Sequence, residues 1–339
     1  MSSNSTTREE FRRLTPAERV ERLKRLAAAA LEHFGLAPDS TLELLKYREN
    51  AVFRVDEAAS GRRCVLRVHR EDYQTPASVL SELLWMGALC ETGINTPRPL
   101  AGRDGQWVRT VSVPGVPEPR HCDVISWVDG EPLEVAQSVE AYRLLGELHA
   151  RLHCHSRHWS PPPDFTRQHW DEEGMLGDEP LWGRFEDLEA LDADQRALMQ
   201  QARRVVLDRL ARFGKREDRF GLIHADFMPD NVLIHRGVAS VIDFDDCGFG
   251  WYLYDPATLF AFSVADDAFP TMLDAWAEGY RSVAGLPDEH LAELPTFIMA
   301  RCLVGLGWLH TRRETDMARL LTDPIVKLVC DYAESLLAR

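Results

Sequence analysis

The sequence predicts an α+β chain of two lobes, with a small strand-rich N-lobe and a mostly helical C-lobe. Its 339 residues suffice for about two domains at roughly 150 residues each. Short apolar runs of strand type fill residues 41–128, whereas long helical patterns dominate residues 129–339. Residues 1–40 precede both lobes as a tail and a helix. The short linker near 128–133 predicts a cleft between the lobes.

The N-terminal segment predicts one helix after a mobile tail of about 15 residues. Thr15 is suited to cap that helix, Pro16 to begin its first turn and Glu18 to complete a capping box. The helical pattern continues to about residue 34. Gly35 then predicts its end, because glycine readily adopts the left-handed conformation that closes helices.

The remaining elements follow from the period of the apolar residues. Runs rich in β-branched and apolar residues predict strands at 42–55 (two strands around a polar turn), 64–69, 107–112 and 122–128. Apolar residues three and four positions apart predict helices at 78–90, 139–158 and 195–213. A hairpin at 232–242, with a turn at 235–237, interrupts the helical C-lobe, and the last third is helical again.

Composition excludes several classes of protein. The formal net charge of −15 argues against a nucleic-acid partner, because an acidic chain repels phosphate backbones. Apolar stretches fall short of the roughly 18 residues of a membrane span, and the N-terminus does not resemble a secretory signal. Seven cysteines without a C-x-x-C pair favour reduced thiols. We therefore expect a cytoplasmic protein without membrane partners.

The most informative polar residues lie at 224–231 and 241–245, between short apolar runs. Asp226 follows His224 by two residues, Asn231 follows Asp226 by five, and Asp243 follows Asn231 by twelve. Phosphoryl transfer from ATP explains these residue types, because a carboxylate such as Asp226 can orient and deprotonate a hydroxyl. Asn231 and Asp243 offer the hard oxygen ligands that Mg²⁺ prefers. The alternative is a polar turn in which Asp226 and Asp243 are only capping residues.

This segment resembles the aminoglycoside phosphotransferase and choline kinase family, a group of small-molecule kinases with a protein-kinase-like fold. The match rests on His224-Ala225-Asp226, Asn231 and Ile242-Asp243-Phe244-Asp245. The resemblance extends from about residue 42 to residue 260. It implies ATP and Mg²⁺ as cofactors, and it implies that Asp255 in Tyr254-Asp255-Pro256-Ala257 supports the catalytic loop.

The same resemblance assigns nucleotide contacts in the N-lobe. Asn50 would lie at the turn of a phosphate-covering hairpin, and Arg67 would bind phosphate oxygens with Glu82 as its ion-pair partner. The backbone carbonyl of Ser126 and the N–H of Val128 would bind adenine. Without the family, Arg67 is equally well explained as a solvated strand residue and Glu82 as an exposed one.

Departures from protein kinases favour a small-molecule acceptor. Ala225 replaces the arginine of their catalytic loop, residues 243–245 read Asp-Phe-Asp in place of Asp-Phe-Gly, and an Ala-Pro-Glu segment is missing. We expect the acceptor pocket in the acidic, Trp-containing stretch 170–187 and in the region 301–314. The candidate residues for acceptor contact are Trp182, Asp245, Asp246, Trp308 and Arg312. The tryptophans have an alternative role as core anchors.

A pair of histidines in the predicted helix 139–158 has two interpretations. His149 and His153 have the spacing of zinc ligands on a helix, but they lack a third ligand, so core packing is the favoured interpretation.

The predicted function is ATP- and Mg²⁺-dependent phosphorylation of a hydroxyl on an amino alcohol, a hydroxy amino acid or an aminoglycoside. The alternatives are a stress-response-type Ser/Thr protein kinase of this superfamily and a nucleotide-binding pseudokinase or scaffold. A homodimer through the N-terminal helix is also left open.

Overall fold

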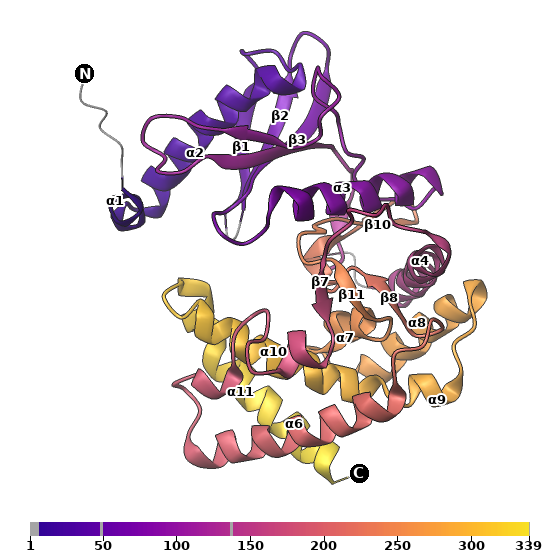
Figure 1. Cartoon of the computed structure of the whole chain (residues 1–339). Helices are drawn as coiled ribbons and strands as arrows, with labels where there is room; N and C mark the ends of the chain where they lie inside the picture. The colour runs from indigo at the N-terminus through magenta and orange to yellow at the C-terminus, as the bar shows by residue number, and fades with distance from the viewer. Residues whose placement is uncertain (1–6, 48–49, 136–137, 339) are drawn as a thin grey trace. The chain divides into compact units, whose positions relative to one another are not determined.

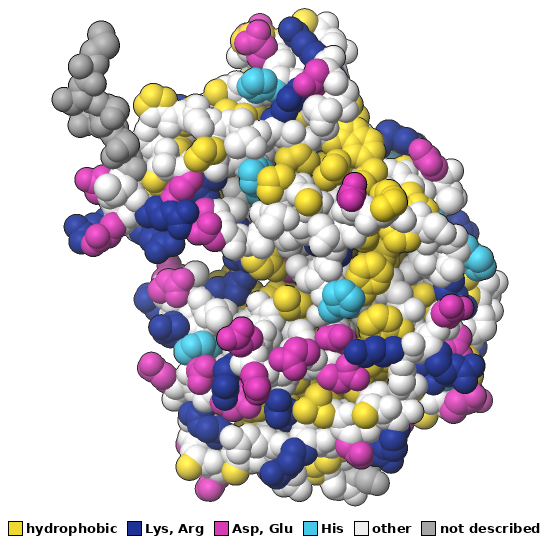
Figure 2. All heavy atoms as spheres, in the orientation of Figure 1, with side chains coloured by type: hydrophobic (Ala, Val, Ile, Leu, Met, Phe, Trp, Pro, Cys, Tyr) yellow, Lys and Arg dark blue, Asp and Glu magenta, His cyan; other side chains and the backbone are white. Residues whose placement is uncertain are grey.

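The computed structural model describes residues 7–47, 50–135 and 138–338 (Figure 1). By its internal contacts the chain divides into two units. Unit 1 comprises Met1–Asp129 with Pro161–Thr166, and unit 2 comprises Gly130–Ser160 with Arg167–Arg339. Acidic and basic side chains intermix over the face shown in Figure 2.

Unit 1 is built on an antiparallel sheet of five strands in the order β1-β2-β3-β5-β4. Alternate residues of β2 (Ala51, Phe53 and Val55) point into the core, as expected for a sheet with one covered face. Helix α3 follows β3, and Thr75 caps its first turn. The bounds are β1 Thr41–Tyr47, β2 Ala51–Glu57, β3 Arg62–Val68, α3 Pro76–Glu91, β4 Arg109–Val111 and β5 Arg120–Ser126.

The N-terminal residues are more ordered than the sequence predicts. A short helix, α1 (Arg8–Arg13), begins at a capping box between Thr7 and Glu10, so the expectation of a mobile tail up to residue 15 is wrong there. Helix α2 (Pro16–Ala30) begins at the predicted Thr15–Glu18 box and continues as a 3₁₀ turn to Gly35, where φ is 68°. Both helices bury apolar side chains in the core of unit 1, and for α1 the tail hypothesis overlooked this packing.

Unit 2 is mostly helical, and α10 forms its centre. This helix packs against α6, α7 and α11, and its residues between Leu294 and Leu309 are almost all buried. The stretch Asp288–Thr311 is long and apolar enough to cross a membrane, but 72% of its most apolar window is buried within the protein. The helices are α4 Val139–His158, α5 Glu172–Leu176, α6 Ala193–Phe213, α7 Tyr254–Phe260, α8 Phe269–Val283, α9 Asp288–Leu291, α10 Leu294–Thr311 and α11 Asp316–Leu337.

Two three-stranded sheets of unit 2 position the polar motif. The predicted hairpin is present as β9 and β10, joined by a turn in which Arg236 and Gly237 have φ of 49° and 76°, as a type I′ turn requires. The sheet orders are β10-β9-β6 and β7-β11-β8, with β7 parallel to β11. Their bounds are β6 Glu131–Pro132, β7 Gln168–Trp170, β8 Phe220–Ile223, β9 Val232–His235, β10 Val238–Val241 and β11 Gly248–Trp251.

The two histidines of α4 are core residues rather than a zinc site. The indole Nε1 of Trp276 donates to Nδ1 of His149 at 2.7 Å, and His153 contacts the Tyr280 hydroxyl at 3.1 Å and the Asp255 carboxylate at 3.0 Å. Within the described residues, His, Cys, Asp and Glu side chains form no cluster of three or more that could hold a metal. The packing interpretation is therefore the one that the structure supports.

The burial of His149 predicts a pH-dependent contribution to stability. Burial lowers the pKa of His149 to about 3, whereas an unfolded histidine titrates near 6.5. Between these values the unfolded chain binds one more proton at this residue, so stability rises with pH. For His149→Gln, we expect the free energy of unfolding to rise less steeply between about pH 4 and 6, by about 1.4 kcal/mol per pH unit. Urea unfolding across that range checks it; equal slopes would contradict it.

Candidate active site

The loop between β8 and β9 brings the predicted base and a predicted metal ligand together. The Asn231 amide nitrogen donates to the backbone carbonyl of Asp226 at 2.9 Å and to Oδ2 of the same residue at 3.2 Å. On its other side, Oδ1 of Asp226 accepts from Nη2 of Arg301 at 2.8 Å. The Asp226 carboxylate is therefore held from two sides, by its own loop and by α10.

The electrostatic surroundings of Asp226 suit a base that works near neutral pH. Burial raises the pKa of Asp226 to about 7, against the opposing effect of Arg301. The carboxylates of Asp246 and Asp243 contribute to this rise, so the structure gathers these predicted site residues within one electrostatic neighbourhood. A carboxylate with such a pKa accepts a proton more readily than an ordinary aspartate.

Two residues beside this base have strained backbones. Ala225 has φ of 67° and Asp243 has φ of 66°, the left-handed region that residues with a Cβ rarely occupy. Each such residue costs about 1–3 kcal/mol and persists only where its surroundings fix it. Both lie in the motif on which the sequence hypothesis rests, one directly before Asp226 and the other at the predicted metal ligand.

A buried carboxylate fixes the first of these residues. Oδ1 of Asp255 accepts the backbone N–H of Ala225 at 2.7 Å, and Oδ2 accepts the N–H of His224 at 3.2 Å. Burial acts to raise the pKa of Asp255, but the hydrogen bond from His153 and the charges of His153, His149 and His224 together outweigh it, so the net shift is downward and the carboxylate stays ionised. The prediction that Asp255 supports the loop is confirmed.

His224 connects the loop to the strand end that carries Asp243. Its Nε2 lies 3.0 Å from the carbonyl oxygen of Ile242, so Nε2 carries the proton, and Nδ1 accepts the backbone N–H of Asp226 at 3.3 Å. Burial lowers the pKa of His224, which favours this neutral form. The backbone N–H of Ile242 also donates to the backbone carbonyl oxygen of Asn231 at 2.9 Å. The base and both predicted metal ligands therefore belong to one hydrogen-bonded unit.

The donor atoms at this unit fit a hard divalent cation. The side-chain nitrogen of Asn231 donates to Asp226, so the side-chain oxygen of Asn231 points away from Asp226. Asp243 adds a half-buried carboxylate. Mg²⁺ commonly takes one or two protein oxygens and completes its shell with phosphate oxygens and water. Asn231 and Asp243 match that donor set.

On the acceptor side, the structure gathers some of the predicted residues and separates others. Trp182 lies with its ring centroid 4.5 Å from the Arg301 guanidinium and its Nε1 3.4 Å from Oδ1 of Asp246. The buried Asp245 follows Asp243 by two residues. Arg312 stacks on Trp308, 5.2 Å from its ring, and Trp308 lies about 10 Å along α10 from Arg301.

Sequence reasoning missed Arg301 as a partner of the base. It entered only as the first residue of the region 301–314. A signal was present, because Arg301 is a single charged residue within the apolar stretch Phe297–Leu306. A buried arginine needs a partner, and a carboxylate is the usual one.

In unit 1, Arg67 and Glu82 form the predicted ion pair at 2.6 Å, and both are buried. A third residue was missed. Asp123 lies directly opposite Arg67 on β5 and accepts from its Nε and Nη2, each at 2.9 Å. His69 Nε2 lies 2.5 Å from the same carboxylate. Because of this burial, the alternatives of a solvated Arg67 and an exposed Glu82 are wrong.

The other predicted nucleotide contacts lie at the ends of strands. Oδ1 of Asn50 accepts the backbone N–H of Arg70 at 3.0 Å; the two turn residues before it, 48 and 49, lie outside the described residues. Ser126 is the last residue of β5, and its Oγ accepts from the backbone of Arg98 at 2.8 Å. Val128 follows two residues later. Their contacts with a nucleotide stay predictions.

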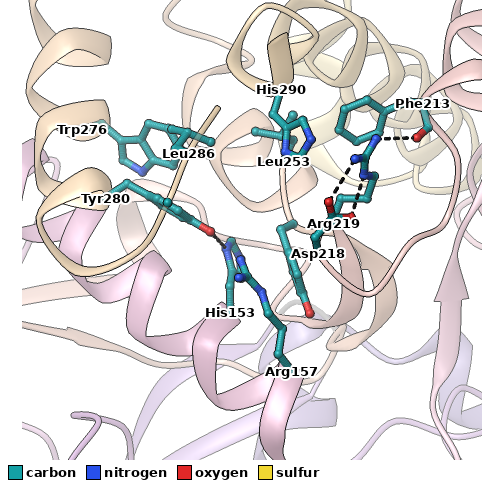
Figure 3. Close-up of a pocket in the computed structure, with 12 residues that line it drawn as sticks. His153, Arg157, Phe213, Asp218, Arg219, Leu253, Trp276, Tyr280, Leu286 and His290 are labelled. Atoms are coloured by element: carbon teal, nitrogen blue, oxygen red, sulfur yellow. Dashed lines mark hydrogen bonds and ion pairs between the residues drawn. The ribbon is translucent and has the colours of Figure 1, made fainter. Parts of the chain in front are cut away.

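A narrow pocket in unit 2 lies behind the catalytic loop rather than at it. Figure 3 shows His153 pointing to Tyr280 at its wall, with Arg157 nearby and Arg219 paired with Asp218. The predicted site residues are not among those that line this pocket. Through His153 the pocket wall contacts Asp255, so it belongs to the packing that supports the loop.

Comparisons with known proteins identify relatives over most of the chain. A solved structure of a microcompartment-associated aminopropanol kinase is 36% identical, with a TM-score of 0.85 over 93% of this chain and 98% of that one. An amicoumacin kinase in complex with AMP-PNP, Ca²⁺ and Ami is 23% identical, with a TM-score of 0.75 over 96% of each chain, and supports the fold. A homoserine kinase from Gluconobacter oxydans is 28% identical over 73% of this chain and 77% of that protein.

These relatives confirm the predicted two-lobed, protein-kinase-like fold of small-molecule kinases. The chain is a kinase that transfers a phosphoryl group to a hydroxyl of a small molecule, and the protein-kinase and scaffold alternatives are not favoured. A model of the phosphotransferase enzyme family matches residues 41–292. Because that match covers well over half of the chain, the protein belongs to the phosphotransferase enzyme family.

Proposed function

We propose that this kinase transfers the γ-phosphoryl group of ATP, with Mg²⁺, to the hydroxyl of a small amino alcohol. The observation that carries the proposal is the contact of Asp226 with Asn231, joined through His224 and Ile242 to Asp243. This arrangement holds a base with a pKa of about 7 in the same hydrogen-bonded unit as two hard oxygen ligands.

In this proposal Asp226 orients the acceptor hydroxyl and takes its proton as the oxygen attacks the γ-phosphorus, while the bond from that phosphorus to the β–γ bridging oxygen breaks and ADP leaves. Arg301 donates to Oδ1 of Asp226, and the Asn231 amide donates to Oδ2, so both contacts fix the orientation of the carboxylate. Asn231 and Asp243 would hold Mg²⁺, which would neutralise charge on the triphosphate. The left-handed backbone at Ala225 and Asp243 fixes the direction of these side chains, and such positioning is a main contribution to phosphoryl transfer.

We assign the phosphate tail to Arg67. A guanidinium has five N–H donors, and three of them are engaged by Asp123 and Glu82 among the described residues. The other two suit phosphate oxygens, because the fork is already oriented by two buried carboxylates. Asn50 at the hairpin, and the backbone of Ser126 and Val128 for adenine, complete the proposed nucleotide contacts.

An amino alcohol suits the acceptor side of unit 2. Aminopropanol and homoserine, which name two of the relatives, each carry an amino group and a hydroxyl. The carboxylate of Asp246 beside the Trp182 ring provides the negative charge and aromatic surface that an ammonium group binds. Asp245 in the same segment, and Trp308 with Arg312 farther along α10, are further proposed acceptor contacts. We further propose that the enzyme works in the cytoplasm.

A coupled ADP-release assay against amino alcohols, hydroxy amino acids, aminoglycosides and a generic protein substrate tests this function. We expect an amino alcohol to give the highest kcat/KM. Asp226→Asn should lower kcat by about 10²–10⁴-fold, because it removes the base, while the Kd for ATP stays nearly unchanged. Asp331→Asn, an exposed carboxylate on α11 paired with Lys327, is the matched control. Full turnover by Asp226→Asn, or a preference for the protein substrate, would contradict the proposal.

The Arg67 cluster generates a separate prediction on nucleotide affinity. Asp123→Asn removes the charge that orients the Arg67 fork, so we expect the KM for ATP to rise by about 10–100-fold, with a smaller change in kcat. Asp56→Asn is the matched control, because Asp56 is likewise an arginine-paired aspartate of the same sheet, in contact with Arg54 and Arg63, but is partly exposed. Glu82→Gln should weaken ATP binding in the same direction. An unchanged KM for ATP in both cluster variants would show that Arg67 does not bind the nucleotide.

A further inference from the structure

Side chains from the short segment 167–170 donate hydrogen bonds to the backbone carbonyls that follow Asp243. Nη2 of Arg167 donates to the carbonyl oxygen of Asp245 at 2.5 Å and lies 3.5 Å from that of Phe244, and its Nε donates to that of Cys247 at 2.7 Å. The carbonyl of the remaining residue, Asp246, accepts from Gln168 at 2.9 Å and Trp170 at 2.7 Å. The carbonyls of four successive residues are thus engaged by residues 167–170.

Arg167 is buried, with 5% of its surface exposed, although it is a cation that normally seeks solvent or a carboxylate. A buried guanidinium is retained at a cost unless its donors are satisfied, and here backbone carbonyls accept from its Nε and Nη2. Its planar fork spans several acceptors at fixed angles, which an ammonium group on a lysine cannot reproduce. The residue therefore fixes the path of the backbone rather than the position of one neighbour.

The position of this contact gives it a function. Asp243 holds a left-handed backbone with φ of 66°, a conformation that persists only where the surrounding structure fixes it. His224 fixes the preceding residue through the Ile242 carbonyl, and Arg167 fixes the following residues. With both flanks held, the direction in which the Asp243 side chain leaves the backbone is set.

We propose that Arg167 is a positioning residue for the metal ligand Asp243, with Gln168 and Trp170 of β7 as auxiliary contacts. The proposal rests on the function proposed above, in which Asp243 binds a divalent cation. Groups that orient metal ligands typically contribute about 10–100-fold to metal affinity or activity. The segment after Asp243 also carries Asp245 where protein kinases have a flexible glycine. The contacts from Arg167, Gln168 and Trp170, which we call the clamp, therefore hold a backbone that already resists rearrangement.

The test measures metal binding directly. Mn²⁺ is titrated into the full-length protein with AMP-PNP, and free Mn²⁺ is followed by electron paramagnetic resonance. We expect Arg167→Met to raise the Kd for Mn²⁺ by about 10–100-fold, and Arg167→Lys to restore binding only in part. In the activity assay, the concentration of Mg²⁺ at half-maximal rate should rise in parallel, with partial recovery of kcat at high Mg²⁺.

The matched control is Arg203, a half-buried arginine of α6 whose guanidinium also donates to a backbone carbonyl, that of Leu176. Arg203→Met should leave the Kd for Mn²⁺ unchanged. If Arg167→Met does not fold by circular dichroism, Gln168→Leu decides instead. That variant removes one donor from the clamp, and we expect a rise in the Kd for Mn²⁺ of roughly three- to tenfold.

Two failures are distinguishable. If Asp243→Asn binds Mn²⁺ as tightly as the wild type, the proposed metal site itself is wrong. If Asp243→Asn loses binding but Arg167→Met, or Gln168→Leu where the former does not fold, binds like the wild type, the metal site stands and the positioning role of Arg167 is overturned.

Discussion

The candidate active site depends on the hydrogen bonds that the buried carboxylate of Asp255 accepts. This carboxylate accepts the backbone N–H groups of His224 and Ala225, the two residues directly before the proposed base Asp226. A carboxylate without access to water strongly favours such donors, because an unsatisfied buried oxygen is costly. His153 on α4 supports the same carboxylate, so a helix of the core determines where the catalytic loop begins.

Buried hydrogen bonds also hold the two strained backbone residues of the site. Ala225 and Asp243 both adopt left-handed backbones, and each would relax if its neighbours released it. Asp255 holds the first from the core of unit 2, and His224 transmits that constraint to Ile242, next to the second. Buried polar contacts thus stabilise a local geometry that the backbone alone disfavours, and the result is a fixed direction for the carboxylates of residues 226 and 243.

Local signals in the sequence were sufficient for most of the elements. The Thr15–Glu18 box, the amphipathic period of α4 and the Arg236-Gly237 turn each concern neighbours within a few residues, and each is found where it was predicted. The same reasoning overlooked α1, since its capping box from Thr7 to Glu10 stands in a Ser/Thr-rich tail without a long apolar period.

The motif residues 226, 231 and 243 could be predicted because their chemistry and spacing are characteristic. Their partners could not. Asp123 is 56 residues from Arg67, Arg301 is 75 from Asp226, and Arg167 is 78 from Asp245. Strand register and helix packing bring these pairs together, and neither leaves a periodic signal in one sequence. The clue that remains is a charged residue in an apolar surrounding, as at Arg301.

Amide hydrogen exchange at residues 224–227 tests the role of Asp255 most directly. In Asp255→Asn, the amide NH₂ cannot accept a hydrogen bond, so one backbone N–H loses its partner and both lose a charged one. The account predicts that exchange at His224 and Ala225 accelerates by about 10–100-fold, while the β9–β10 hairpin keeps its protection. Equal exchange at these two amides in both proteins would contradict the claim that Asp255 holds the catalytic loop.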